Sequence, residues 1–505
     1  MANLRSISQT VSRRFFGRPR RKIALWIALF CVATPWPPPF AEAQQDILLP
    51  EVVVSATRTP EPLEKIGTTV TVLTQEDLRA AGTDIRDALR QVPGFSVVGQ
   101  GTRGSSTSVF SRGGESNFNL VLIDGVKVNA AGGDFDFGDL TLDNIERIEI
   151  LRGPQSALYG SEAMSSVIQI FTRKGRGAPE GDFSFQGGSF ETFEEQVSFR
   201  FGKGGFGFSL GAGRTDTDGI LRVNNRFRNT VVSSLADYSA GDWLKAQFSL
   251  RYSDSRNHFP TGDAGDRFDT PDPNQFLDRE RLVLAPRVEA QVLPWWRHVL
   301  QAGYYKENRF FDDPADAGVD LFGDFQSDTD EERLSADYLW HFGPWPVSQV
   351  KARPTLGFAV EKESIDRTSI SAGTRTTLDE SRTNYAFFTQ LRLSFQDRLF
   401  FTPGFRVDDN GNFGSAVSPK VPLAYLIPKW GTKLRGVYAE GIKAPTFIEA
   451  FGLGTTVGNP NLDPERSRSW EVGFDQDLWG KRARFGFTYF QNRFRDLIAF
   501  VGGSG

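Results

Sequence analysis

Between about residue 182 and residue 500, apolar side chains recur at every second position of the chain. In the run from Val197 to Phe201 the odd positions are apolar, and in the run from Leu244 to Tyr252 the even positions are apolar. A period of two places alternate side chains on opposite faces of a β-sheet. The pattern therefore predicts a large antiparallel β structure, and a soluble sandwich and a membrane barrel would both produce it.

The connections between these runs are more specific than the runs themselves. Because neighbouring strands are antiparallel, strict alternation of short and long connections puts every tight turn on one side and every long loop on the other. Outer-membrane barrels have this asymmetry. Tryptophans near strand ends, such as Trp243 and Trp479, fit the aromatic girdles of such barrels, although tryptophan is also common in ordinary cores. The short connections lie at 202–205, 239–242, 293–296, 395–398 and 478–481, and the long ones lie near 213–230, 254–280, 306–332, 363–382 and 441–467.

The N-terminus has the features of an export signal. Residues 1–22 carry seven basic side chains and no acidic one, and the apolar run Ile23–Ala33 is too short to span a bilayer as a helix. Ala41-Glu42-Ala43 supplies small residues for cleavage. We therefore predict a signal peptide at 1–43, with ordinary secretion favoured over the twin-arginine route that Arg13-Arg14 suggests.

Composition excludes several kinds of partner and chemistry. Removal of residues 1–43 changes the net charge from −4 to −10, because seven basic residues and one acidic residue are lost. The mature chain lacks the basic footprint of a nucleic-acid-binding protein, so no nucleic-acid partner is expected. Cys31 is the only cysteine and lies in the predicted signal peptide. His258, His298 and His341 show no metal-ligand spacing, and the sequence contains no recognisable catalytic constellation.

The segment before the repetitive region is predicted to form a compact α+β domain. Thr74 has the character of a helix N-cap, with Asp77 three residues later. A second helix is predicted from Asp84 to Val92, and strands follow at 119–124 and 145–151.

Several motifs in both regions resemble those of one known family. They are similar to the plug domain of TonB-dependent outer-membrane transporters and, late in the chain, to an extracellular loop and strand of that family's barrel. Their spacing is closest to that of the vitamin B12 (cobalamin) branch. The motifs lie at Asn119–Asn129, Ile145–Gly160, Val167–Lys174, Gly441–Thr446, Gly458–Glu465 and Trp470–Phe474.

The resemblance implies a transmembrane antiparallel β-barrel with an N-terminal α+β plug domain inside its lumen. The expected domains are a periplasmic segment at 44–58, the plug at 59–178 and the barrel at 179–505. The runs and turns give about 15 strands, fewer than the roughly 22 of plugged outer-membrane transporters. We therefore expect the barrel to be incomplete at its C-terminus, so that this polypeptide alone would not form a stable barrel.

A short β-prone segment with three successive valines follows the predicted signal peptide. It is either the first strand of the next domain or a strand with no partner of its own, which another protein would capture by β-augmentation. In the family that the chain resembles, such a motif is the TonB box. The resemblance implies that the periplasmic C-terminal domain of TonB, energised by the inner-membrane proton gradient, pairs with it. The segment consists of Glu51, Val52, Val53, Val54, Ser55 and Ala56.

Two Gly-rich stretches of the plug region, 99–116 and 129–138, are predicted loops. In the family, such loops face the ligand. The residues predicted to face it are Arg103, Phe110, Arg112, Asn129 and Phe135.

Aspartates crowd two of the long connections. Hard oxygen ligands at this density suit Ca²⁺, and the cobalamin branch orders extracellular loops with calcium through aspartates. The alternative is a solvated, self-repelling loop, and these positions do not align residue by residue with the family motif. The predicted calcium ligands are Asp263, Asp266, Asp269, Asp312, Asp313, Asp316 and Asp320, and no cofactor is otherwise required.

These observations predict TonB-dependent uptake of a scarce small molecule across the outer membrane of a Gram-negative-type bacterium. Cobalamin or a related corrinoid is the expected ligand, and a ferric siderophore is the alternative within transport. A ligand-sensing signalling receptor is the alternative of another class. Such a receptor carries an additional periplasmic domain before the TonB box, where only Gln44–Pro50 lies. No enzymatic activity is expected.

Overall fold

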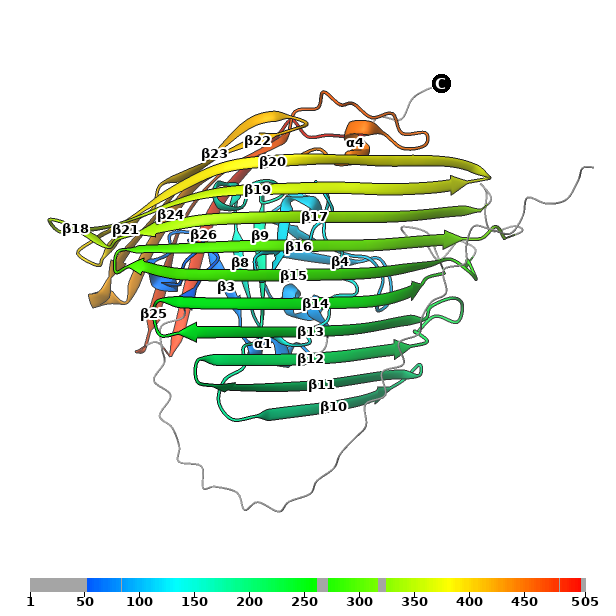
Figure 1. Ribbon diagram of the computed structural model, residues 1–505, viewed down its shortest axis with the longest axis horizontal. Helices are drawn as coiled ribbons and strands as arrows, with labels where there is room; N and C mark the ends of the chain where they lie inside the picture. Colours follow the sequence, from blue (N-terminus) through cyan, green and yellow to red (C-terminus); the bar gives the residue numbers. More distant parts are fainter. Residues whose placement is uncertain (1–51, 83, 261–270, 317–323, 481, 501–505) are drawn as a thin grey trace, which may run out of the picture. The chain divides into compact units, whose positions relative to one another are not determined.

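The computed structural model describes residues 52–82, 84–260, 271–316, 324–480 and 482–500. The predicted signal peptide, the segment that follows it and Glu51 lie outside the described residues. Within the described chain, a small mixed α/β unit lies against the inner face of one long curved β-sheet (Figure 1). We call residues 52–172 the plug domain and residues 180–495 the barrel sheet.

The plug domain is built on a five-stranded sheet with the order β3-β8-β9-β6-β7. β6 and β9 run parallel, whereas the other neighbours are antiparallel. Apolar residues of this sheet and of two helices form the larger buried core. The elements are β1 (Val52–Val53), β2 (Glu61–Pro62), η1 (Leu63–Lys65), β3 (Val70–Leu73), α1 (Gln75–Ala80), α2 (Ile85–Arg90), β4 (Phe95–Gly99), β5 (Thr107–Ser111), η2 (Ser116–Phe118), β6 (Asn119–Ile123), β7 (Val126–Lys127), β8 (Ile145–Arg152), α3 (Ser156–Tyr159) and β9 (Ser166–Thr172).

Local signals place the first two helices as predicted. α1 begins after Thr74, whose hydroxyl accepts a hydrogen bond from the Asp77 N–H while Asp77 accepts one from the Thr74 N–H. α2 begins after Asp84, whose carboxylate accepts from the Arg86 N–H. Both caps satisfy backbone donors that the first turn of a helix leaves without a partner. Within the described ranges, none of the helices is long and apolar enough to cross a membrane.

The barrel sheet follows the sequence order from β10 to β26, with antiparallel neighbours. Two of its strands are interrupted: β17 and β18 both pair with β19, and β21 and β22 both lie between β20 and β23. The breaks contain Pro344 and Pro403, which have no N–H to donate to a neighbouring strand. The 17 strands therefore occupy fifteen positions in the sheet, which agrees with the predicted count.

The strands of the barrel sheet lengthen toward the middle of the sheet and shorten again. They are β10 (Glu180–Gly188), β11 (Thr192–Lys203), β12 (Phe206–Thr217), β13 (Phe227–Ala240), β14 (Leu244–His258), β15 (Phe276–Leu293), β16 (Trp296–Asp313), β17 (Phe325–Phe342), β18 (Trp345–Val347), β19 (Val350–Ser371), β20 (Thr374–Phe395), β21 (Leu399–Phe401), β22 (Gly404–Asn410), β23 (Gly414–Ile427), β24 (Thr432–Lys443), β25 (Glu465–Leu478) and β26 (Ala483–Arg495). A 3-10 turn, η3 (Pro428–Trp430), precedes β24, and a short helix, α4 (Phe447–Phe451), follows it. Among the described residues, β10 and β26 each pair on one side only.

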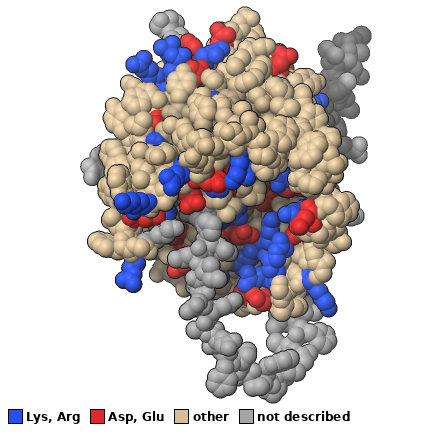
Figure 2. Space-filling model, turned by 90° about the vertical axis from the view of Figure 1, so that its left-hand side faces the viewer, with Lys and Arg blue, Asp and Glu red and all other residues tan. Residues whose placement is uncertain are grey.

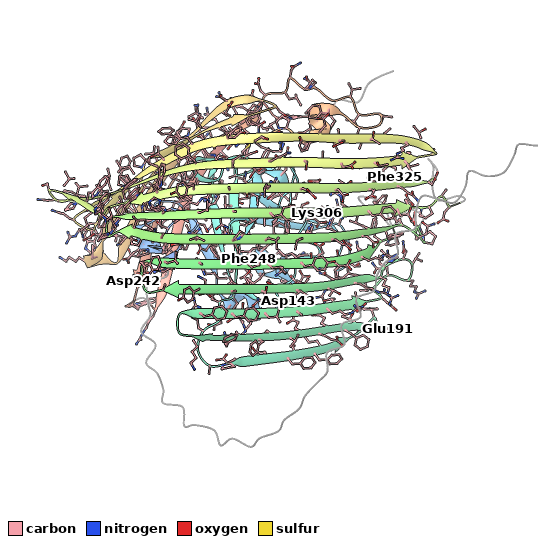
Figure 3. All side chains as sticks on the ribbon, viewed as in Figure 1. Asp143, Glu191, Asp242, Phe248, Lys306 and Phe325 are labelled. Atoms are coloured by element: carbon pink, nitrogen blue, oxygen red, sulfur yellow. The ribbon has the colours of Figure 1, made fainter. Side chains whose placement is uncertain are left out.

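Four of the five predicted long connections separate their strands as predicted, but three-residue turns at 189–191 and 411–413 also lie at the long-loop end of the sheet. Asp242 lies at the short-turn end of the sheet and Phe325 lies at the opposite end (Figure 3). The predicted long loop at 363–382 was wrong, because β19 and β20 extend to Ser371 and Thr374 and a two-residue turn joins them. Apolar residues are sparse at the ends of these strands, where Ile365 and Leu378 are buried on the inner face, so no regular apolar alternation marks the ends in the sequence.

Side chains alternate between the two faces of the barrel sheet. On β14, Phe248 points away from the plug domain and is 45% exposed, whereas the neighbouring Ser249 is buried (Figure 3). Large exposed apolar side chains, such as Phe358 and Tyr385, continue this outer face on other strands. An apolar outer face and a polar inner face are typical of barrels that cross membranes.

Candidate functional site between the plug domain and the barrel sheet

The segment predicted to bind a partner strand is folded back onto its own chain. Val52–Val53 pairs with Glu61–Pro62 in a short antiparallel ladder, and Val53 is fully buried. The next residues, Val54–Thr57, form a turn that is closed by a 3.3 Å hydrogen bond between its first carbonyl and its last N–H. The hypothesis of a strand with no partner was therefore wrong for this conformation, because β2 supplies the partner.

A buried carboxylate on the plug strand β8 holds this turn. Glu149 is fully buried, and its Oε2 accepts hydrogen bonds from the N–H groups of Val54 and Ser55, both at 2.9 Å. The same oxygen accepts from the Ser55 hydroxyl at 2.7 Å. Oε1 accepts two hydrogen bonds from the Arg147 guanidinium, at 3.0 and 2.9 Å. Both oxygens are therefore satisfied, as a buried charge requires.

Two further contacts tie the same turn to its surroundings. The Tyr159 hydroxyl donates to the Ser55 carbonyl at 2.8 Å, and burial raises the pKa of Tyr159 to about 12, so the hydroxyl keeps its proton at neutral pH. Arg58 forms an ion pair with Asp337 on β17 at 2.8 Å, and its guanidinium lies over the Tyr159 ring. The N-terminal segment therefore contacts both the plug domain and the barrel sheet.

A second contact between plug domain and barrel sheet is centred on Glu471 of β25. One of its oxygens lies 2.7 Å from the Arg112 guanidinium, and both side chains are almost fully buried. Its other oxygen accepts from the N–H and the hydroxyl of Thr69, both at 2.9 Å, and lies 3.8 Å from Arg435. Loss of one member of such a buried pair leaves an uncompensated charge.

A third contact fixes the plug loop that precedes β8. Asp136 and Asp139 form ion pairs with Arg279 and Arg281 on β15. Glu307 on β16 pairs with Arg281 at 2.6 Å and completes the network. The loop is thereby held against β15 and β16 of the barrel wall.

A cavity of about 800 Å³ lies between the plug domain and the last strands of the barrel sheet, beside the contact at Glu471. Lysine and arginine side chains also gather beside acidic ones in the hollow centre of the short-turn face (Figure 2). Basic residues outnumber acidic ones in the cavity lining, which contains Arg112, Arg152, Lys433, Arg435 and Arg484 against Glu64, Asp475 and Asp477.

The residues predicted to face a ligand have different surroundings. Asn129 and Phe135 are buried inside the plug domain, and Arg112 is held by its barrel ion pair. Packing and hydrogen bonding occupy these three side chains in this conformation. Arg103 is partly exposed in an ion pair with the barrel wall, and Phe110 is half-buried on β5. Ligand contact by all five residues stays a prediction.

Three of the predicted calcium ligands, Asp312, Asp313 and Asp316, lie within the described residues. Asp316 accepts a hydrogen bond from the Asn274 side chain at 2.9 Å. In the part of the chain that the structure describes, no group of three or more His, Cys, Asp or Glu side chains could hold a metal ion. Calcium binding therefore stays a prediction. The other four predicted ligands, Asp263, Asp266, Asp269 and Asp320, lie outside the described residues.

Sequence reasoning missed the carboxylates that organise these contacts. For Glu149 a signal was present, since a single acidic residue interrupts the apolar run from Ile148 to Leu151. An acid in the middle of a buried strand predicts a buried partner. The partner itself could not be read from the sequence, because Ser55 is 94 positions away.

Comparison with known protein families agrees with this architecture. The family model described as "TonB dependent receptor-like, beta-barrel" matches residues 173–505, and the "TonB-dependent Receptor Plug Domain" matches residues 62–167. The chain belongs to the TonB-dependent receptor family. The plug match covers the receptor's strand β8 and most of its plug sheet.

Individual relatives extend the comparison. The receptor is 28% identical over 473 residues to a vitamin B12 transporter, BtuB, of Photobacterium profundum, a match that covers 91% of this chain and 72% of the relative. Among solved structures, the siderophore receptor PirA from Acinetobacter baumannii matches with a TM-score of 0.67 and 20% identity, over 85% of this chain and 71% of PirA. FpvA of P. aeruginosa, bound to a pyoverdine–iron complex, matches with a TM-score of 0.73 and 14% identity, over 87% of this chain and 65% of FpvA.

Proposed function

We propose that this receptor transports cobalamin or a related corrinoid across the outer membrane into the periplasm. The observation that carries the ligand assignment is the 28% identity to a vitamin B12 transporter over most of the chain. The solved siderophore receptors share the fold at 14–20% identity. A ferric siderophore is therefore the alternative ligand. In either case outer-membrane lipid surrounds the apolar outer face of the barrel sheet.

TonB supplies the energy for this transport in our proposal, and Glu51–Ala56 acts as the TonB box. The long loops of outer-membrane barrels are extracellular and the tight turns are periplasmic. Gln390, near the short-turn end of β20, donates to the Thr57 carbonyl, so this segment lies on the periplasmic side. The periplasmic C-terminal domain of TonB pairs with the released segment as an added strand. Force drawn from the inner-membrane proton gradient then displaces part of the plug domain.

Direct binding measurements test the ligand assignment. Outer-membrane preparations that contain the receptor are titrated with cyanocobalamin and, in parallel, with ferric siderophores of the catecholate and hydroxamate classes. We expect saturable binding of cyanocobalamin and none of the siderophores above the level of membranes that lack the receptor. Saturable siderophore binding without cyanocobalamin binding would replace the proposed ligand by the alternative.

Calcium dependence of ligand binding tests the acidic loops. We expect calcium to tighten ligand affinity, and Asp316→Asn combined with Asp320→Asn to erase that effect, because neutral amides are weaker ligands for Ca²⁺ than carboxylates. The control is Asp397→Asn, which removes an exposed carboxylate that pairs with Lys351 near the opposite end of the sheet. The affinity is measured with excess calcium and with a chelator. If neither calcium nor the chelator changes the ligand affinity, the aspartates belong to a solvated loop that does not bind calcium.

A further inference from the structure

The turn at Val54–Thr57 and an added β-strand are conformations that the same backbone cannot adopt together. In an extended strand, successive N–H groups point to opposite sides. Here the N–H groups of Val54 and Ser55 converge on one oxygen of Glu149. Pairing of this segment with a partner strand therefore requires that Glu149 lose at least one of these two donors.

Glu149 is held in place independently of the segment that it binds. Arg147 donates to its other oxygen from two nitrogens, and the Arg147 guanidinium lies 4.0 Å from the centre of the Phe171 ring. On the backbone, Glu149 is paired with Val72 on one side and with Gln169 on the other. The carboxylate is thus a fixed acceptor, and charged acceptors of this kind form the stronger hydrogen bonds.

We infer that Glu149 is the positioning residue that keeps the TonB box closed and competes directly with the partner strand for its backbone donors. This inference rests on the proposed function. The contacts of Tyr159 and Arg58 differ in kind. Tyr159 donates to the Ser55 carbonyl and Arg58 pairs with the Asp337 side chain, so neither occupies the two N–H groups that Glu149 binds. Glu149 therefore sets how readily the box adopts the extended conformation.

Chemical labelling of a buried residue of the box tests this inference. The only native cysteine, Cys31, lies in the predicted signal peptide, so Ala56→Cys, at a side chain that is 6% exposed, provides a single reporter. We expect Glu149→Gln to raise the rate of maleimide labelling about tenfold or more in the absence of ligand, because one charged hydrogen-bond acceptor is lost. The matched control is Ala88→Cys, in α2 on the other core of the plug, which is 1% exposed.

General loosening of the plug domain would raise labelling at both positions and would overturn the inference. Labelling that rises only at Ala56→Cys supports it. Ser55→Ala is the second variant, since it removes only the 2.7 Å hydroxyl bond and leaves the Arg147 pair intact. It should raise labelling by a smaller factor, on the order of threefold to tenfold. If Glu149→Gln folds, the inference is overturned when neither variant increases labelling. If Glu149→Gln does not fold, the inference is overturned when Ser55→Ala does not increase labelling.

Binding of the isolated periplasmic C-terminal domain of TonB separates this inference from the proposed function. We expect that domain to bind the Glu149→Gln receptor more tightly than the parent when no ligand is present. Increased labelling without TonB binding in either receptor would support the role of Glu149 and overturn the TonB-box assignment. Ligand-dependent TonB binding by the parent, without increased labelling in the variants, would support the TonB-box assignment and overturn the role of Glu149.

Discussion

Replacement of Val53 by proline is expected to abolish uptake while ligand binding stays within about twofold of the parent. Proline has no backbone N–H and restricts the conformation of the residue before it, so it removes a donor from any ladder that the segment forms. In the resting structure Val53 pairs with Glu61 and is fully buried. Uptake is measured as accumulation of labelled cyanocobalamin by cells, and binding is measured on their outer membranes.

The control for this variant is Val53→Ala at the same position. It loses buried apolar surface but keeps the N–H group, so it separates loss of packing from loss of the donor. We expect Val53→Ala to retain most of the uptake. Equal accumulation by Val53→Pro and the parent would show that strand pairing at this segment does not drive transport.

Replacement of Glu471 by alanine is expected to lower the free energy of unfolding by about 3–5 kcal/mol, as is usual when one partner of a buried ion pair is removed. The variant leaves Arg112 buried without its carboxylate and deprives Thr69 of the acceptor for two hydrogen bonds. Because these groups join the plug domain to β25, protease digestion of the plug domain should also accelerate. Denaturant unfolding and limited proteolysis in detergent measure the two effects.

Glu440→Ala is the matched control for Glu471→Ala. Glu440 lies on the neighbouring strand β24 and pairs with Arg468, whose side chain is 53% exposed. Exposed pairs of this kind contribute roughly 0–1 kcal/mol. Similar destabilisation by the two substitutions would mean that the Arg112–Glu471 pair has no special role in holding the plug domain.

The sequence predicted the elements whose signals are local. The Thr74 cap and the alternation within strands such as β14 depend on residues a few positions apart, and both appear in the structure. Strand length was harder to predict, because β19 and β20 extend to Ser371 and Thr374 through segments with few apolar residues. Buried polar side chains such as Glu363 occupy the inner face there, so that face carries no continuous apolar alternation.

The candidate site was less predictable than the fold because its contacts join distant parts of the chain. Glu471 and Thr69 are 402 positions apart, and Arg58 and Asp337 are 279 positions apart. Period two indicates which strand residues point inward, but it does not indicate which inward residue faces which plug residue. The predicted ligand contacts lie in Gly-rich stretches of the plug region, and the fold uses some of them, such as Asn129, to build the plug interior.

The position of β3 in the plug sheet has a mechanical consequence. β3 is an edge strand, and it pairs with β8 through four residue pairs that begin at Val70 and Leu151. It is also the first strand of that sheet along the chain, so tension applied to the segment before it reaches Val70 first. A pull across the strand direction would break these pairs one at a time, as in unzipping, rather than all together. The strands β8, β9, β6 and β7 have pairings of their own that do not involve β3, so such a pull would remove one edge of the plug sheet and leave those pairings in place.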